Sequence, residues 1–308
     1  MIEAKHIRKE YNGLVAVKDL TLRLNKGDIY GFIGPNGAGK TTTIKIFATL
    51  LQPTSGEAYI AGYDVVKEPL KVRKYIGYMP DFFGVYEDLK VGEYLEFFAA
   101  SYALPKQERK QILNDVLELT DLVEKKNSYV AELSRGMRQR LCLAKTLIHD
   151  PEVLLLDEPA SGLDPRARIE MREILKELKK MGKTIFISSH ILPELADFCD
   201  KVGVIERGEL LASGSIEEIM HHITSDRVIT IGVLDGLESA KKTLEDFSSI
   251  SAFKVEGNVI KANFKGEDSE LSEILRSLIL NEVKVVSFTE EDTNLEDLFM
   301  KITRGEVA

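Results

Sequence analysis

One short segment restricts the possible folds of this chain more than any other: Gly34-Pro35-Asn36-Gly37-Ala38-Gly39-Lys40-Thr41. It follows the apolar run Ile29–Ile33 and precedes residues of helical spacing, Thr41–Leu51. The glycines let the backbone fold back and direct N–H groups toward one point, and the helix adds the positive end of its dipole. The segment therefore predicts a phosphate-binding loop between a strand and a helix.

Side chains that complete such a site lie in the loop and in a second segment. Lys40 can reach the β- and γ-phosphates of a nucleotide, and the Thr41 hydroxyl can ligate Mg²⁺. The run Val153–Asp157 is apolar until its last residue, a carboxylate that can hold Mg²⁺ through water. Glu158 points differently, because side chains alternate along a strand, and can orient the attacking water. Together these segments predict a P-loop nucleoside triphosphatase.

A third segment, Leu133-Ser134-Arg135-Gly136-Met137-Arg138-Gln139-Arg140, leads directly into a helix. A Ser and a Gly that open a helix form a second anion site by the same dipole argument. One nucleotide does not need both helix starts of one chain. The second helix start can instead bind the γ-phosphate of a nucleotide that a neighbouring chain holds. The alternative interpretation is a plain helix with a Ser cap.

In this order the motifs resemble those of the nucleotide-binding subunit of an ABC (ATP-binding cassette) transporter, over residues 1 to about 218. Leu133–Met137 resembles the signature motif, and Ser161-Gly162-Leu163-Asp164 resembles the D-loop. Tyr11 stands where the family has an aromatic side chain that stacks on adenine. Ser188-Ser189-His190 ends a strand where the family has its switch histidine.

The resemblance implies a head-to-tail dimer that holds two ATP molecules, each between the P-loop of one chain and Ser134 and Gly136 of the other. It assigns catalysis to Lys40, Glu158 and His190. The expected nucleotide contacts are Tyr11, Gly34, Pro35, Asn36, Gly37, Ala38, Gly39, Lys40, Thr41, Thr42, Ser134, Gly136 and Asp164. The expected Mg²⁺ ligands are Thr41, Asp81 and Asp157.

The sequence departs from the family pattern at two places. Asp81 follows Pro80 where the family usually has Gln or Glu; it is shorter and acidic, and it can bind Mg²⁺ through water. Arg135 replaces the usual Gly of the signature and either adds a positive charge near the phosphate or points to solvent. The aromatic residues of Phe82–Tyr86 suit either a groove for a membrane partner or a local core.

Alternating helices and buried strands predict an α/β core with a largely parallel sheet. The resemblance implies the P-loop fold of the family: a RecA-like core with an antiparallel β-subdomain and a helical subdomain at about residues 88–150. Beyond it, we expect residues 219–308 to form a small α+β domain. Its pattern is βαββαβ, a ferredoxin-like arrangement, with an added helix at Leu295–Ile302. In pattern, though not in motifs, this part resembles the extension on ATP-binding subunits of drug-export-type ABC transporters.

Charge and composition limit the partners. The chain has 308 residues and a net charge of −9; residues 219–308 carry 10 Lys/Arg against 17 Asp/Glu, which argues against a nucleic-acid surface there. No apolar stretch approaches the roughly 20 residues that cross a bilayer. We therefore expect an ATP- and Mg²⁺-dependent ATPase, peripheral on the cytoplasmic face of the membrane. Its expected partners are an integral membrane subunit and a second, identical or paired, ATPase subunit.

The preference for export over import rests on the C-terminal extension. Two other functions are alternatives to transport. An ABC ATPase that acts on DNA would carry a long coiled coil between the P-loop and the signature; fewer than 100 residues separate Lys40 from Ser134. One that acts on ribosomes would have two cassettes, and a single P-loop is present. A regulatory module with little hydrolysis disagrees with intact Lys40, Asp157, Glu158 and His190.

Overall fold

The computed structural model describes residues 1–308 except 83, 192–194, 196–197, 217, 220–226 and 292–308. The chain divides into two compact units, Met1–Ile216 and Glu217–Ala308. This division lies two residues before the boundary expected from the sequence.

The first unit is built on a ten-stranded sheet in the order β5-β4-β1-β2-β10-β9-β3-β8-β7-β6. From β9 to β6 the neighbours are parallel, whereas β1 pairs antiparallel with β2 and β4. The strands are β1 (Ile2–Tyr11), β2 (Leu14–Leu24), β3 (Ile29–Ile33), β4 (Ser55–Ile60), β5 (Tyr63–Asp64), β6 (Ile76–Met79), β7 (Val153–Asp157), β8 (Thr184–Ser189), β9 (Lys201–Glu206) and β10 (Glu209–Gly214).

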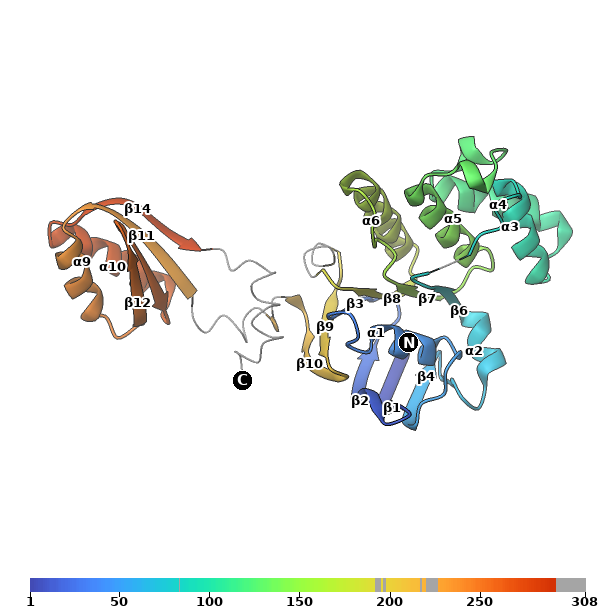
Figure 1. The fold of residues 1–308 in the computed structure, drawn as a ribbon, viewed down its shortest axis with the longest axis horizontal. Helices are drawn as coiled ribbons and strands as arrows, with labels where there is room; N and C mark the ends of the chain where they lie inside the picture. The colour runs from blue at the N-terminus through green and yellow to red at the C-terminus, as the bar shows by residue number, and fades with distance from the viewer. Residues whose placement is uncertain (83, 192–194, 196–197, 217, 220–226, 292–308) are drawn as a thin grey trace. The chain divides into compact units, whose positions relative to one another are not determined.

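The central strands β3, β7 and β8 are buried along their whole length, because helices cover both faces of a parallel sheet. The helices of this unit are α1 (Lys40–Phe47), α2 (Pro69–Tyr75), α3 (Val91–Ser101), α4 (Lys106–Leu119) and α5 (Arg135–Leu147), the short η1 (Val123–Lys125) and η2 (Val130–Glu132), and α6 (Pro165–Lys180). Figure 1 shows α3, α4 and α5 gathered beside β6, with β1, β2 and β4 in a separate part of the unit. The predicted core, β-subdomain and helical subdomain are thus all present.

Helix α2 of this unit was not predicted from the sequence, and one prediction lies outside the described residues. Helix α2 has seven residues, of which only Val72 is buried, so it shows no amphipathic period. The helix expected at Leu295–Ile302 falls within residues 292–308, which the structure does not describe.

The second unit has the predicted βαββαβ order and its own core. Its elements are β11 (Arg227–Asp235), α9 (Leu237–Glu245), β12 (Ile250–Glu256), β13 (Val259–Phe264), α10 (Asp268–Leu280) and β14 (Lys284–Glu291). The strands form an antiparallel sheet in the order β12-β13-β11-β14. Ile231, Ile260, Phe264, Ile274 and Leu278 are fully buried in it. This is the ferredoxin-like arrangement expected from the sequence.

Candidate nucleotide site

The glycine-rich loop between β3 and α1 is shaped by close backbone contacts. A Cβ at Gly34 would overlap the carbonyl oxygen of Ile205 in β9. Gly39, which precedes the first residue of α1, has φ 110° and lies equally close to the backbone of Ala16. Side chains at either position would displace the loop. The loop can therefore lie flat against β2 and β9, where the N–H groups of Gly34 and Ala38 donate to the carbonyl oxygens of Ser189 and Pro35.

A cavity of about 310 Å³ opens beside this loop. Residues 36–42 of the loop form one wall, Tyr11, Leu14 and Ala16 form a second, and Asp81 and Glu158 close a third. Tyr11 is 40% exposed and Leu14 is 71% exposed, so both present apolar surface to the cavity. A planar base can stack on that wall while its phosphates follow the loop toward α1.

Lys40 lies at the start of α1 and is only 5% exposed. Its Nζ donates hydrogen bonds to the carbonyl oxygens of Gly34 and Pro35 at 2.6 and 3.2 Å. The same nitrogen lies 3.2 Å from Oε1 of Glu158 and forms an ion pair with it. This contact does not have the geometry of a hydrogen bond. The ammonium group is thus directed across the loop toward the carboxylate.

Asp157, the last residue of β7, is 1% exposed. Ser188, its register partner on β8, donates a hydrogen bond from Oγ to Asp157 Oδ1 at 2.7 Å. Burial raises the pKa of Asp157, the negative charges of Asp81 and Glu158 add to this, and hydrogen bonds from Ser188 and Thr41 oppose it. Among the described residues, Asp157 Oδ2 has no hydrogen-bond partner.

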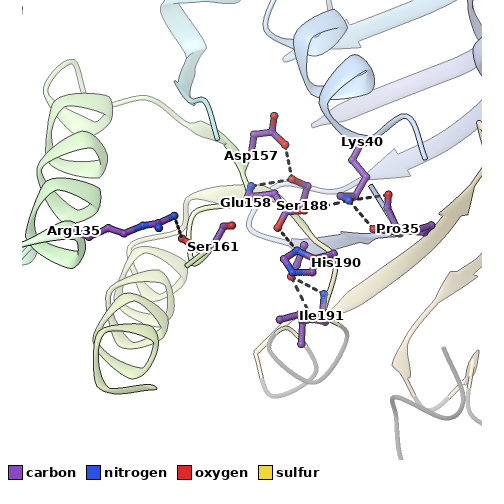
Figure 2. A network of polar contacts seen from close by, with 11 residues as sticks. Pro35, Lys40, Arg135, Asp157, Glu158, Ser161, Ser188, His190 and Ile191 are labelled. Atoms are coloured by element: carbon purple, nitrogen blue, oxygen red, sulfur yellow. Dashed lines mark hydrogen bonds and ion pairs between the residues drawn. The ribbon is translucent and has the colours of Figure 1, made fainter. Parts of the chain in front are cut away.

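Glu158 occupies the centre of the polar network in Figure 2. Its backbone has φ 51°, a left-handed conformation that costs a non-glycine residue about 1–2 kcal/mol. Its N–H donates to Ser188 Oγ at 3.0 Å, and its Oε2 lies 2.8 Å from Nδ1 of His190. This sharp turn, and not only strand alternation, directs the Glu158 carboxylate to a point between Lys40 and His190.

The helix start at the signature-like segment does not line this cavity. Ser134 is exposed and caps α5, accepting a hydrogen bond from the N–H of Met137 at 3.3 Å. Gly136 packs against Ala167 of α6. Arg135 donates from Nη2 to the carbonyl oxygen of Ser161 at 3.1 Å, which neither of the two alternatives from the sequence had included. Ser134 and Gly136 are thus separate from the phosphate loop of their own chain.

Three other predicted residues differ in how far the structure brings them to the cavity. Asp81 lines it, whereas Asp164 is exposed outside it and caps α6 by accepting from the N–H of Ala167 at 2.8 Å. His190 is linked to the cavity through its contact with Glu158.

The aromatic cluster expected at Phe82–Tyr86 is partly exposed. Phe82 is 91% exposed, and Tyr86 packs on Tyr94 and Phe97. Residue 83 lies outside the described residues.

Three residues of the site were not among the site residues predicted from the sequence. Leu14 and Ala16 line the cavity just after the turn that follows Tyr11, and their only signal was that position. Ser188 joins Asp157 to the N–H of Glu158 through one hydroxyl group. The signal for Ser188 was its place as a polar residue near the end of a buried strand. That strand lies beside the strand that ends in Asp157, and neighbouring parallel strands end at the same edge of a sheet.

The residues present fit a divalent cation bound together with a nucleotide. The partnerless Oδ2 of Asp157 is a buried anionic oxygen, Thr41 contacts the same carboxyl group, and Asp81 adds a second carboxylate nearby. Mg²⁺ is held in such sites by one or two protein oxygens with waters and phosphate oxygens. A site of this kind is compatible with the finding that the described residues contain no cluster of three or more His, Cys, Asp or Glu able to hold a metal alone.

Known proteins resemble this chain over nearly its whole length. A family model described as "ABC transporter" matches residues 17–161, and one for the C-terminal domain of "ATP-binding protein DrrA1-3-like" matches residues 214–303. The chain is 30% identical to the linearmycin resistance ATP-binding protein LnrL of Bacillus subtilis, over 98% of each chain. It is 32% identical to the Nod factor export ATP-binding protein I of Burkholderia orbicola, over 99% of this chain and 98% of that one.

Solved structures give the same answer for the fold. The ATP-binding subunit of an ABC transporter is 31% identical, with a TM-score of 0.66 over 73% of this chain and 93% of that chain. A dimeric ATP-binding cassette bound to ADP and phosphate, MJ0796, is 26% identical, with a TM-score of 0.64 over 70% of this chain and 99% of that chain. No helix among the described residues is long and apolar enough to span a membrane. The chain belongs to the ATP-binding subunits of ABC transporters and is an ATP-hydrolysing enzyme of that family.

Proposed function

We propose that this protein is the motor subunit of an ABC exporter, in which two identical chains bind two Mg²⁺–ATP between them and drive a separate membrane subunit. The observation that carries the proposal is the separation of two phosphate-binding helix starts. The P-loop borders the cavity with Tyr11, Asp81 and Glu158, whereas Ser134 and Gly136 open α5 outside it. The second helix start is then available to the γ-phosphate of a nucleotide on a partner chain.

The residues of one chain divide the work of hydrolysis. Tyr11 stacks on the base, and the N–H groups of the loop with Lys40 bind the phosphates and stabilise charge on the transferred group. Thr41, Asp157 and Asp81 would hold Mg²⁺, which would neutralise phosphate charge.

Glu158 orients the attacking water and accepts its proton, and Nδ1 of His190 keeps the Glu158 carboxylate in place at 2.8 Å. Because ATP buries its phosphates against both chains, its binding favours the closed dimer and hydrolysis reopens it.

Export and the site of action are supported by the relatives. Relatives that match nearly the whole chain are named for antibiotic resistance and for Nod factor export, and the C-terminal unit matches a family found on ATP-binding proteins of the DrrA type. A subunit of this kind would lie on the cytoplasmic face of the membrane, where ATP is available. The aromatic side chains of Phe82 and Tyr86, both exposed, suit contact with a membrane subunit.

A Glu158→Gln variant tests the hydrolytic role. The amide cannot accept a proton from water, so we expect turnover to fall on the order of 100- to 1,000-fold, while ATP binding remains and the ATP-bound dimer accumulates. The measurements are steady-state ATPase activity and dimer mass by light scattering with ATP and Mg²⁺. A variant with normal turnover would remove Glu158 from the role, and a strictly monomeric variant with bound ATP would refute the two-chain site.

A further inference from the structure

Arg135, the residue that departs from the family signature, makes a contact that its sequence position does not suggest. It is the first residue of α5, and its guanidinium group reaches the loop before α6, where Nη2 donates to the carbonyl oxygen of Ser161 at 3.1 Å. Figure 2 shows this side chain extended from the helix toward Ser161. The contact joins segments 26 residues apart in sequence.

Gly162 makes room for this contact. A Cβ at Gly162 would overlap Nη2 and Cζ of Arg135, so the guanidinium group lies directly against the Gly162 backbone. Gly162 also has φ 66°, which favours glycine in its own right. The guanidinium group is therefore fixed by its hydrogen bond to Ser161 and by van der Waals contact with Gly162.

The contact continues through Ser161 to the backbone of Glu158, the residue that carries the catalytic carboxylate. The N–H of Ser161 donates to the carbonyl oxygen of Glu158 at 3.0 Å, while the carbonyl oxygen of Ser161 accepts from Arg135. Glu158 has a left-handed backbone that the surrounding structure must maintain. Arg135 thus supports the turn that directs the Glu158 side chain.

We infer that Arg135 is a positioning residue that links the two ATP sites of the dimer. This inference rests on the proposed two-chain site, in which Ser134 and Gly136 contact the partner's ATP while Glu158 acts on the ATP of its own P-loop. Arg135 lies between Ser134 and Gly136 in the sequence, and its side chain contacts the loop that follows Glu158. Movement of the α5 N-terminus on one nucleotide is therefore transmitted to the carboxylate that hydrolyses the other.

The test uses the full chain with four substitutions. Arg135→Ala removes the link, Arg135→Lys keeps one donor without the planar group, and Gly162→Ala displaces the guanidinium group. Arg166→Ala is the matched control, because Arg166 also lies in the first turn of a helix, and the contact that the structure gives its side chain is with Glu170 at 3.1 Å.

We expect Arg135→Ala to lower kcat about three- to tenfold, the effect of losing one hydrogen bond, with little change in KM. Its Hill coefficient for ATP should fall toward about 1 from a wild-type value approaching 2, the number of sites. Arg135→Lys should be intermediate, and Arg166→Ala should resemble wild type. Gly162→Ala should be damaging in the wild type and much less so in the Arg135→Ala background, because only its backbone strain remains there.

Hydrogen exchange on the nucleotide-free chain gives a readout that does not need hydrolysis. Peptides that cover residues 158–164 should exchange about three- to tenfold faster in Arg135→Ala than in wild type. Unchanged exchange, or strictly additive effects of Arg135→Ala and Gly162→Ala, would overturn the positioning role. A wild-type Hill coefficient near 1 would overturn the link between sites. A wild-type chain that does not hydrolyse ATP would instead refute the proposed function, and exchange would still decide the role of Arg135.

Discussion

Asp157→Asn should have opposite effects on stability and on activity. The asparagine side chain has nearly the same shape, and its Oδ1 can still accept the hydrogen bond from Ser188. The atom that changes is Oδ2, which makes no hydrogen bond among the described residues. Packing is therefore preserved, and the substitution removes mainly a negative charge that is almost completely buried.

The sign follows from the pKa of Asp157, which burial raises above 3.8. As the pH rises from 3.8, the carboxyl group ionises first in the unfolded chain, so folding loses stability between that pH and the folded pKa. Above the folded pKa of Asp157 the loss is complete. Removing the charge should then raise the free energy of unfolding by about 1 kcal/mol, or about 3 °C in Tm for a unit of this size.

The assay is thermal unfolding without nucleotide and with EDTA, over a pH series from about 7.5 down to 3.8. The advantage of Asp157→Asn should shrink as the pH falls through the folded pKa of Asp157, because the wild-type carboxyl group is then protonated. Mg²⁺-dependent ATPase activity should fall on the order of 100-fold. Asp88→Asn, which removes an exposed carboxylate of the same unit, should change stability by less than about 0.5 kcal/mol. An Asp157→Asn variant no more stable than wild type, or a pH-independent gain, would refute the reasoning.

Two further substitutions test the walls of the cavity. Ser188→Ala deprives Asp157 of a donor and the Glu158 N–H of an acceptor, so steady-state assays should show kcat about tenfold lower with a nearly constant KM. Tyr11→Ala removes the aromatic surface beside the loop; the KM for ATP should rise about tenfold while kcat stays close to wild type, and Tyr11→Phe should restore binding. An unchanged KM in Tyr11→Ala would place the base elsewhere.

Much of the fold could be predicted because its signals are local. Ile29–Ile33 and Val153–Asp157 match the observed strands residue for residue, since continuous apolar runs of that length read as buried parallel strands. Helix α2 escaped prediction because seven residues with one buried side chain carry no periodicity. Proline at its first position was the only signal.

The positions of site residues were predictable only where strand order decides them. Asp157 and Ser188 end neighbouring parallel strands, so their proximity follows from topology. The direction of Arg135 does not, because it depends on where a loop 26 residues further along the chain lies. The left-handed turn at Glu158 is equally hidden, since glutamate has no preference for it.

The contacts around Glu158 indicate that the fold fixes the orientation of its carboxylate more than it changes its charge. Its two carboxylate oxygens face Lys40 and Nδ1 of His190 at 3.2 and 2.8 Å, and its backbone is fixed from both sides by Ser188 and Ser161. All of these groups except Lys40 lie at or beyond the carboxyl ends of β7 and β8. Loss of a backbone support should therefore lower kcat, whereas loss of a cavity wall should raise KM.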